Sequence, residues 1–273
     1  MSITRRKLIR TGIFSLAGIL LLDGVWMERF FIEIREFFLG SATTESRNIK
    51  IVQISDLHLH SINYQLTKLI KKINSLQPDL IVFTGDVVDK AKNISLLDEF
   101  LKLINKDIKK IAILGNWEYL GKVNIPELRQ VYADNNCELL INESVQHSFH
   151  NKTISVTGVD DYVCGKPDFD VAVRGYKLSD YHIVLIHCPE YSDHIDAKRH
   201  NNVNIDCILS GHTHGGQINV FGFVPYLPKG CGRYLKGWYN NNNYKLYVSK
   251  GVGCIIPIRI GARAEMAIFN FSA

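Results

Sequence analysis

The chain has 273 residues, of which 46% are apolar and 22% are charged, and its formal net charge is +5. This length and composition are typical of a globular protein with one domain and a full core. Residues 1–48 hold seven Lys or Arg and five Asp or Glu, which leaves only +3 for the rest, too little for a nucleic-acid-binding protein.

The N-terminal 48 residues differ in pattern from the rest of the chain. A basic stretch at 4–10 precedes an uncharged, mostly apolar run at 11–22. Paired arginines before such a run resemble a bacterial twin-arginine export signal. The run is too short for a transmembrane helix but suits a signal sequence or an interfacial segment.

Apolar residues then recur at helical spacing in 26–39, which predicts an amphipathic helix rich in Phe. Such a helix lies in a membrane interface or packs on its own domain. We expect residues 1–48 to be an uncleaved membrane anchor followed by a linker. The protein would then be membrane-associated in a bacterial cell envelope, on the exported or the cytoplasmic face.

Residues 49–273 are predicted to be one catalytic domain of α/β class. Strands are expected at 49–54, 79–83 and 111–114, and helices at 64–76, at 94–104 and from Pro126. This alternation predicts a largely parallel sheet covered by helices. Shorter alternating runs, which predict more sheet and fewer helices, follow at 154–159, 183–186, 244–248 and 264–271.

Potential metal ligands follow five of the apolar runs at their carboxyl ends, where open α/β sheets place ligand sites. The most distinctive is the Gly-His-Thr-His-Gly-Gly-Gln segment at 211–217. Each motif alone could be a turn, a cap or a histidine bonded to backbone, but five together predict a metal site. The residues are Asp56, His58, Asp86, Asn116, His187, His212 and His214.

This ordered set of motifs resembles the calcineurin-like metallophosphoesterase family over roughly residues 49–273. It combines Asp-x-His, Gly-Asp-x-x-Asp, Gly-Asn-x-Glu, a single His and the 211–217 segment. Within the family, that segment and 247–253 are most similar to a small membrane-linked or exported branch. The branch includes the Bacillus cell-wall enzyme and the UDP-2,3-diacylglucosamine hydrolases. The resemblance implies a four-layer α/β/β/α sandwich with two facing mixed sheets.

The resemblance also implies two divalent metal ions. Carried over by position, the first ion would be held by Asp56, His58 and His214, the second by Asn116, His187 and His212, and Asp86 would bridge them. Mixed carboxylate, imidazole and amide ligands suit Mn, Fe, Zn or similar ions. Two such ions can share a hydroxide and clamp a phosphoryl oxygen for in-line attack. Asp89 is expected to orient a ligand or cap a turn.

One position departs from the family pattern. The family has a His after Asn116, which acts on the leaving group, and this chain has Trp117. An indole N–H can donate a hydrogen bond but cannot deliver a proton. Three explanations stay open: the leaving group is already a good one, such as a phosphoanhydride or an aryl ester; another histidine, best His60, replaces the acid; or turnover is low.

The leading hypothesis is a dinuclear metal-dependent phosphoesterase at a membrane, acting on a phosphorylated small molecule or a lipid-linked substrate. One alternative is a UDP-2,3-diacylglucosamine pyrophosphatase of lipid A synthesis. Another, from a different class, is a weakly active metal-binding scaffold for an envelope partner. No nucleic-acid partner is expected.

Overall fold

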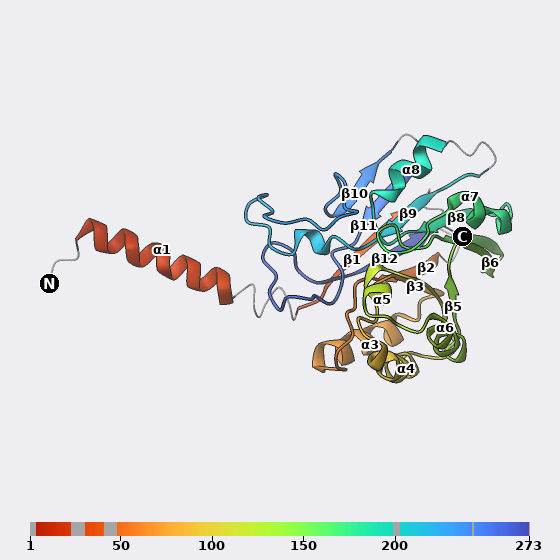
Figure 1. Ribbon diagram of the computed structural model, residues 1–273, viewed down its shortest axis with the longest axis horizontal. Coiled ribbons are helices and arrows are strands. Elements are labelled where there is room, and N and C mark those ends of the chain that lie inside the picture. Colours follow the sequence, from red (N-terminus) through yellow and green to blue (C-terminus); the bar gives the residue numbers. More distant parts are fainter. Residues whose placement is uncertain (1–3, 23–30, 41–47, 199–202, 242, 273) are drawn as a thin grey trace.

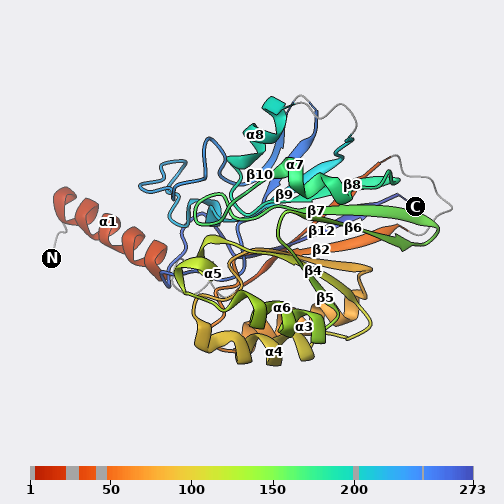
Figure 2. The ribbon, with the colours of Figure 1, turned by 45° about the vertical axis from the view of Figure 1, so that its right-hand side comes forward.

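The computed structural model describes residues 4–22, 31–40, 48–198, 203–241 and 243–272. Two six-stranded sheets lie face to face, and helices cover the outer face of each sheet (Figures 1 and 2). The expected α/β/β/α sandwich with two mixed sheets is therefore confirmed.

The first sheet has the strand order β1-β12-β2-β3-β4-β5. Strands β2 to β5 are parallel, β12 is antiparallel to β2, and β1 is parallel to β12. Its outer face is covered by three helices whose apolar sides pack on it. The bounds are β1 Glu33–Leu39, β2 Ile49–Ile54, α3 Tyr64–Leu76, β3 Leu80–Thr84, α4 Ile94–Lys102, β4 Lys109–Ile113, α6 Ile125–Asp134, β5 Cys137–Leu140 and β12 Glu265–Phe271.

Helix α3 shows how local sequence sets these boundaries. The side chain of Asn63 accepts a hydrogen bond from the backbone N–H of Leu66 and so caps the first turn. The helix ends at Gln77, which adopts a left-handed conformation just before Pro78. One face of the helix is buried against the sheet, as its periodic apolar residues predict.

The second sheet has the order β10-β11-β9-β8-β7-β6. Its four central strands, β7, β8, β9 and β11, are parallel to one another, and the two edge strands are antiparallel to their neighbours. The bounds are β6 Glu143–Phe149, β7 Lys152–Gly158, α7 Phe169–Ala172, β8 Tyr181–Leu185, α8 Tyr191–Lys198, β9 Cys207–Ser210, β10 Gly237–Asn240 and β11 Lys245–Val248.

The inner faces of the two sheets share one apolar core, which includes Ile51 and Val82 from the first and Val156 and Leu209 from the second. Because the main strands of each sheet are parallel, their carboxyl ends meet at one edge. The loops after β2, β3, β4, β8 and β9 therefore approach one another, and the short helix α5, Asn116–Leu120, begins in the loop after β4.

The predicted helix at 26–39 is wrong for residues 33–39, which form strand β1. Their burial alternates along the strand, and the Phe37 ring lies 5.0 Å from that of Tyr247 and 5.6 Å from that of Phe269. Residues 33–39 are thus part of the first sheet, although they precede the expected boundary at residue 49. Residues 26–30 and most of the expected linker, 41–47, lie outside the described residues.

The expected membrane anchor also needs correction. Helix α1 spans Arg5–Leu22, and no helix in the described part of the chain is long and apolar enough to cross a membrane. This finding overturns the expected placement in a cell envelope. The predicted twin-arginine export signal gains no further support, since it rests on the arginine pair alone.

Candidate metal centre

All seven residues expected to bind metal meet at the edge where the parallel strands end. Asp56 and His58 follow β2, Asp86 follows β3, and His187 follows β8. Asn116 begins α5, and His212 and His214 follow β9. Each residue of the set is at most 8% exposed. The sequence therefore identified a group of polar side chains that the fold brings together and buries.

The backbone at this edge is strained in a way that indicates function. Five of the seven residues have positive φ angles, from 44° at His58 to 73° at His212. Non-glycine residues adopt this region rarely, at a cost of order 1 kcal/mol or more each. The others with positive φ are Asp56, Asp86 and His214. Such a cluster is maintained only where the surrounding structure enforces it.

Gly211 lets the two sheets approach closely here. A Cβ atom at this position would overlap the side chains of Ser55 and Asp56. Without one, the backbone N–H of His212 donates to both carboxylate oxygens of Asp56, at 3.0 and 3.1 Å. The glycine therefore allows the loop after β9 to bind the loop after β2.

Hydrogen-bond partners assign one nitrogen of three imidazoles as the protonated one. His58 Nδ1 donates to Asp89 Oδ1 at 2.6 Å. His187 Nδ1 donates to the Thr84 carbonyl, and His212 Nε2 donates to the Lys229 carbonyl, both at 2.8 Å. In the neutral form of each ring the other nitrogen is then an unprotonated lone pair, which is the form that binds metals.

These lone pairs face other acceptors at short range. His58 Nε2 is 3.1 Å from His214 Nε2, and His187 Nε2 is 3.2 Å from His212 Nδ1. The same His187 nitrogen is 3.2 Å from Asn116 Oδ1. Lone pairs this close repel one another unless a proton or a metal ion lies between them. The donors thus fit two metal positions, one beside His58 and His214 and one beside His187, His212 and Asn116.

Asp86 lies between the two groups. Its Oδ2 is 3.2 Å from His187 Nε2 and 3.8 Å from His58 Nε2, while its Oδ1 accepts from the backbone N–H of Trp117 at 2.8 Å. Asp56 completes the first group, with Oδ1 3.7 Å from His214 Nε2. Asp56 also lies close enough to Asp86 and His187 to hold an ion with them.

Burial and neighbouring charges set the protonation of two groups in the centre. Burial disfavours the charge of Asp86, but the imidazoles of His187, His58 and His212 hold its pKa well below the usual range. Burial, together with the nearby charges of His58 and Arg259, lowers the pKa of His214 well below its usual value. Asp86 therefore stays ionised, and His214 stays neutral and able to bind a metal.

Sequence reasoning missed the role of Glu118. Its carboxylate accepts hydrogen bonds from the backbone N–H groups of Gly115, Asp86, Val87 and Val88, at 2.7–3.1 Å. Burial and the neighbouring Asp86 raise the pKa of Glu118 to about 7. This side chain fixes the loop after β3 against the loop after β4. Its position in the Gly-Asn-x-Glu motif was the available signal.

Arg259 was also missed. It is fully buried, donates to the carbonyls of Lys250 and Ala262 at 2.8 Å, and has Nη2 3.4 Å from His214 Nδ1. It thus fixes the 250–262 loop beside the first ligand group. An isolated arginine in an apolar loop gives no local signal of such a role.

Cys188 lies close to His187 and His212, but it is a poor ligand. Its thiol donates to Asp161 at 3.3 Å, and burial and that carboxylate raise its pKa well above the usual value. A protonated thiol does not coordinate these metals. We therefore assign Cys188 to the packing behind the second ligand group.

The centre opens into a cavity of about 350 Å³. Asp86, Asn116, His212 and His214 all contribute to its lining, together with Trp117. The Trp117 ring lies edge-on to that of His58, with 6.2 Å between centroids. The residue that replaces the expected histidine is therefore part of the cavity wall beside the ligands.

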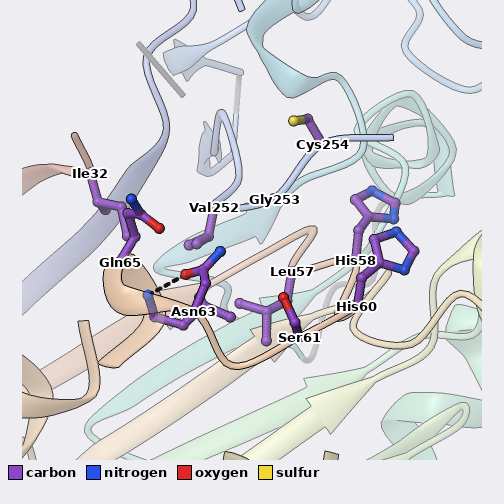
Figure 3. A pocket seen from close by; sticks show the side chains of 11 residues that line it. Ile32, Leu57, His58, His60, Ser61, Asn63, Gln65, Val252, Gly253 and Cys254 are labelled. Atoms are coloured by element: carbon purple, nitrogen blue, oxygen red, sulfur yellow. Dashed lines mark hydrogen bonds between the residues drawn. The ribbon is translucent and has the colours of Figure 1, made fainter. Parts of the chain in front are cut away.

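His60 lies next to His58 but lines a different cavity. It is 53% exposed in its side chain, and its Nε2 is 3.2 Å from Asp89 Oδ2. It lines a separate cavity of about 120 Å³, in which Figure 3 shows His58 and His60 side by side at one end and Asn63 and Gln65 at the other. His60 is absent from the residues that line the larger cavity.

Comparison with known proteins gives consistent matches. The family described as Calcineurin-like phosphoesterase matches residues 49–216. The metallophosphoesterase YkoQ of Bacillus subtilis is 30% identical over 81% of this chain and 82% of its own length. YkuE of the same organism is 28% identical over 91% of this chain and 88% of its own length. A 5'-nucleotidase precursor from Thermus thermophilus aligns with a TM-score of 0.46 at 11% identity, over 82% of this chain and 55% of that one.

Proposed function

This chain belongs to the calcineurin-like phosphoesterase family and is a metal-dependent phosphoric ester hydrolase. We propose that it binds two divalent ions and uses them for hydrolysis. Asp56, His58 and His214 would hold one ion. The other would be held by Asn116, His187 and His212, and Asp86 would be shared. Nitrogen and oxygen donors in this mixture suit Mn, Fe or Zn.

The observation that carries this proposal is the position of the Asp86 carboxylate. One of its oxygens lies within 3.8 Å of a ligand nitrogen from each group, His58 Nε2 and His187 Nε2. A carboxylate oxygen so placed can contact two ions at once. Bound there, the pair of ions would supply a hydroxide nucleophile and neutralise charge on the phosphoryl oxygens.

The residues of the chain then determine which esters react. Trp117 stands in the cavity wall where an acid would be needed, and its indole N–H cannot deliver a proton to a leaving group. His60 faces the other cavity. We therefore propose a substrate whose leaving group departs without protonation, such as an aryl ester or a phosphoanhydride.

The test uses the purified full chain, loaded with Mn, Zn or Fe, on bis(4-nitrophenyl) phosphate, a phosphoanhydride and an alkyl phosphate monoester. We expect metal-dependent hydrolysis of the first two and little of the third. A preference for the alkyl monoester would refute the leaving-group proposal. Tight binding of two ions without hydrolysis of any ester would instead identify a metal-binding scaffold.

A further inference from the structure

We propose that the larger cavity binds an uncharged, apolar organic group of the substrate, so that the substrate class is amphiphilic phosphate esters. This inference rests on the proposed function, because the metal ligands lie in the lining of the same cavity. A phosphoryl group held at Asp86, Asn116, His212 and His214 would place its organic substituent against the remaining walls.

Those walls are built mainly from apolar side chains of three segments. Trp117 and Leu120 come from α5, Ile218 and Tyr226 from the loop after the 211–217 segment, and Ile255 and Ile256 from the loop between β11 and β12. The side chain of Gln217 donates to the carbonyls of Ile256 and Ile258, at 2.9 and 3.2 Å. The third segment is therefore fixed against the second, and the wall is a built feature of the fold.

The charge of the lining separates this substrate class from nucleotides and sugar phosphates. Among the described residues that line the cavity, none is Lys or Arg. Sites for additional phosphates use such cations, and sites for sugars use several polar groups. Gln217 and Thr213 line the cavity, but Gln217 Nε2 and the Thr213 hydroxyl already bond to carbonyls of the protein itself.

Exposed apolar side chains lie on the segments that form these walls. Tyr226 is 74% exposed and Ile256 58%, and the same loop as Tyr226 carries Phe221 at 99% exposure and Phe223 at 71%. Large exposed apolar side chains that gather beside a cavity usually mark a ligand site. A chain of several carbons that leaves the cavity beside Tyr226 and Ile256 could therefore gain further apolar contact.

Kinetics on a homologous series test the proposal. In 4-nitrophenyl methyl, butyl, hexyl and octyl phosphates the leaving group is constant and only the apolar group grows. With the metal-loaded full chain, below micellar concentrations, we expect kcat/KM to rise roughly three- to fourfold per methylene until the cavity is full. The 4-nitrophenyl ester of thymidine 5'-phosphate should be a worse substrate than the octyl ester.

Two variants test whether the cavity walls cause the dependence of kcat/KM on chain length. Ile256→Asn and Tyr226→Ser should flatten the dependence on chain length, because each removes an apolar surface without touching a metal ligand. Leu178→Asn is the control, since Leu178 is also a large exposed apolar residue, at 84% exposure, and does not line the cavity. It should keep the slope of the unaltered protein.

Calorimetry separates failure of this inference from failure of the proposed function. If octyl phosphonate binds the metal-loaded protein at least tenfold more tightly than methyl phosphonate, the cavity is an apolar subsite even where no ester is hydrolysed. Equal affinities, a flat chain-length series, or a preference for the thymidine ester would overturn the inference. Absence of hydrolysis with every ester would count against the proposed function alone.

Discussion

The two sheets contribute different chemistry to the same centre. The acidic groups described at the centre, Asp56, Asp86, Asp89 and Glu118, come from the loops after β2, β3 and β4 of the first sheet. The second sheet contributes three imidazoles, those of His187, His212 and His214. Negative charge is thus supplied from one side of the sandwich and three imidazole nitrogen donors from the other.

The supporting hydrogen bonds differ in the same way. In the first sheet, a carboxylate holds His58, and despite burial Asp89, Asp86 and Asp56 raise its pKa. In the second sheet, a backbone carbonyl holds His212, and burial together with His187 lowers its pKa, whereas Asp86 raises the pKa of His187 despite burial. The comparison teaches that the negative charge of this centre lies in the carboxylates of the first sheet. Removing one of these carboxylates should therefore affect metal binding most, and the first variants below test this.

The largest effect is expected for Asp86→Asn, which removes the shared anion. Activity should fall by well over the ~10–100-fold typical of residues that merely orient a ligand. Calorimetric titration with Mn or Zn should show fewer than two tight sites. Full retention of both ions would mean that Asp86 does not bridge them.

Asp89→Asn should have the next largest effect, because it replaces the charged carboxylate that accepts the hydrogen bond of His58 Nδ1 with a neutral amide. We expect a loss of roughly 10–100-fold in metal affinity or activity. Asp79→Asn is the matched control, since Asp79 pairs with His150 outside the centre. If the two variants behave alike, the contrast between the charged and neutral supports has no functional weight.

Trp117→His restores a group that can deliver a proton in the larger cavity. A well-placed general acid is worth about 10²–10⁴-fold, and an introduced one should recover part of this, roughly tenfold, on alkyl esters. Rates on aryl esters should change little. An unchanged rate on alkyl esters would show that this position does not reach the leaving group.

The smallest effect concerns the pH dependence of stability, and it arises from the buried His182 in the second sheet. His182 Nδ1 donates to the Asn204 carbonyl and its Nε2 accepts from the Thr157 hydroxyl, both at 2.8 Å. Burial, only partly opposed by Asn204, lowers its pKa to about 4 from 6.5. The neighbouring ionisable groups are Asp206, which accepts from the His182 backbone, and the Tyr176 ring, 4.5 Å away.

The unfolded chain therefore binds a proton at His182 at higher pH than the folded chain does. Stability from this group is full above pH 6.5 and is lost as pH falls toward 4. At pH 5 the loss should be about 1–2 kcal/mol relative to neutral pH. Urea unfolding of the protein and of His182→Gln measures it, and an equal pH dependence in both would contradict the assignment.

Sequence patterns predicted the elements whose signals are local. The strand at 49–54 and the helix at 64–76 have the predicted bounds, and the later strands differ by one to three residues at their ends. The candidate ligands could be grouped because each follows an apolar strand at its carboxyl end, where topology alone brings side chains together. No long-range knowledge was needed to place Asp56, Asp86 or His187 at one edge.

The errors occurred where distant segments decide the structure. The apolar spacing of residues 33–39 suits a helix, but this segment forms a strand that pairs with β12 at the other end of the chain. The role of His60 as an acid stays a prediction. Its side chain lines a different cavity from Trp117, which its distance from His58 along the sequence could not show. Arg259 acts through loop contacts that no periodicity reveals.

The central claim is tested most directly by metal content. The purified full chain, reconstituted with Mn or Zn and freed of loosely bound ions, should retain two ions per chain by mass spectrometry of the elements. Removal with a chelator should abolish both the ions and the hydrolysis of bis(4-nitrophenyl) phosphate. One ion or none per chain, with hydrolysis unaffected by the chelator, would contradict the account.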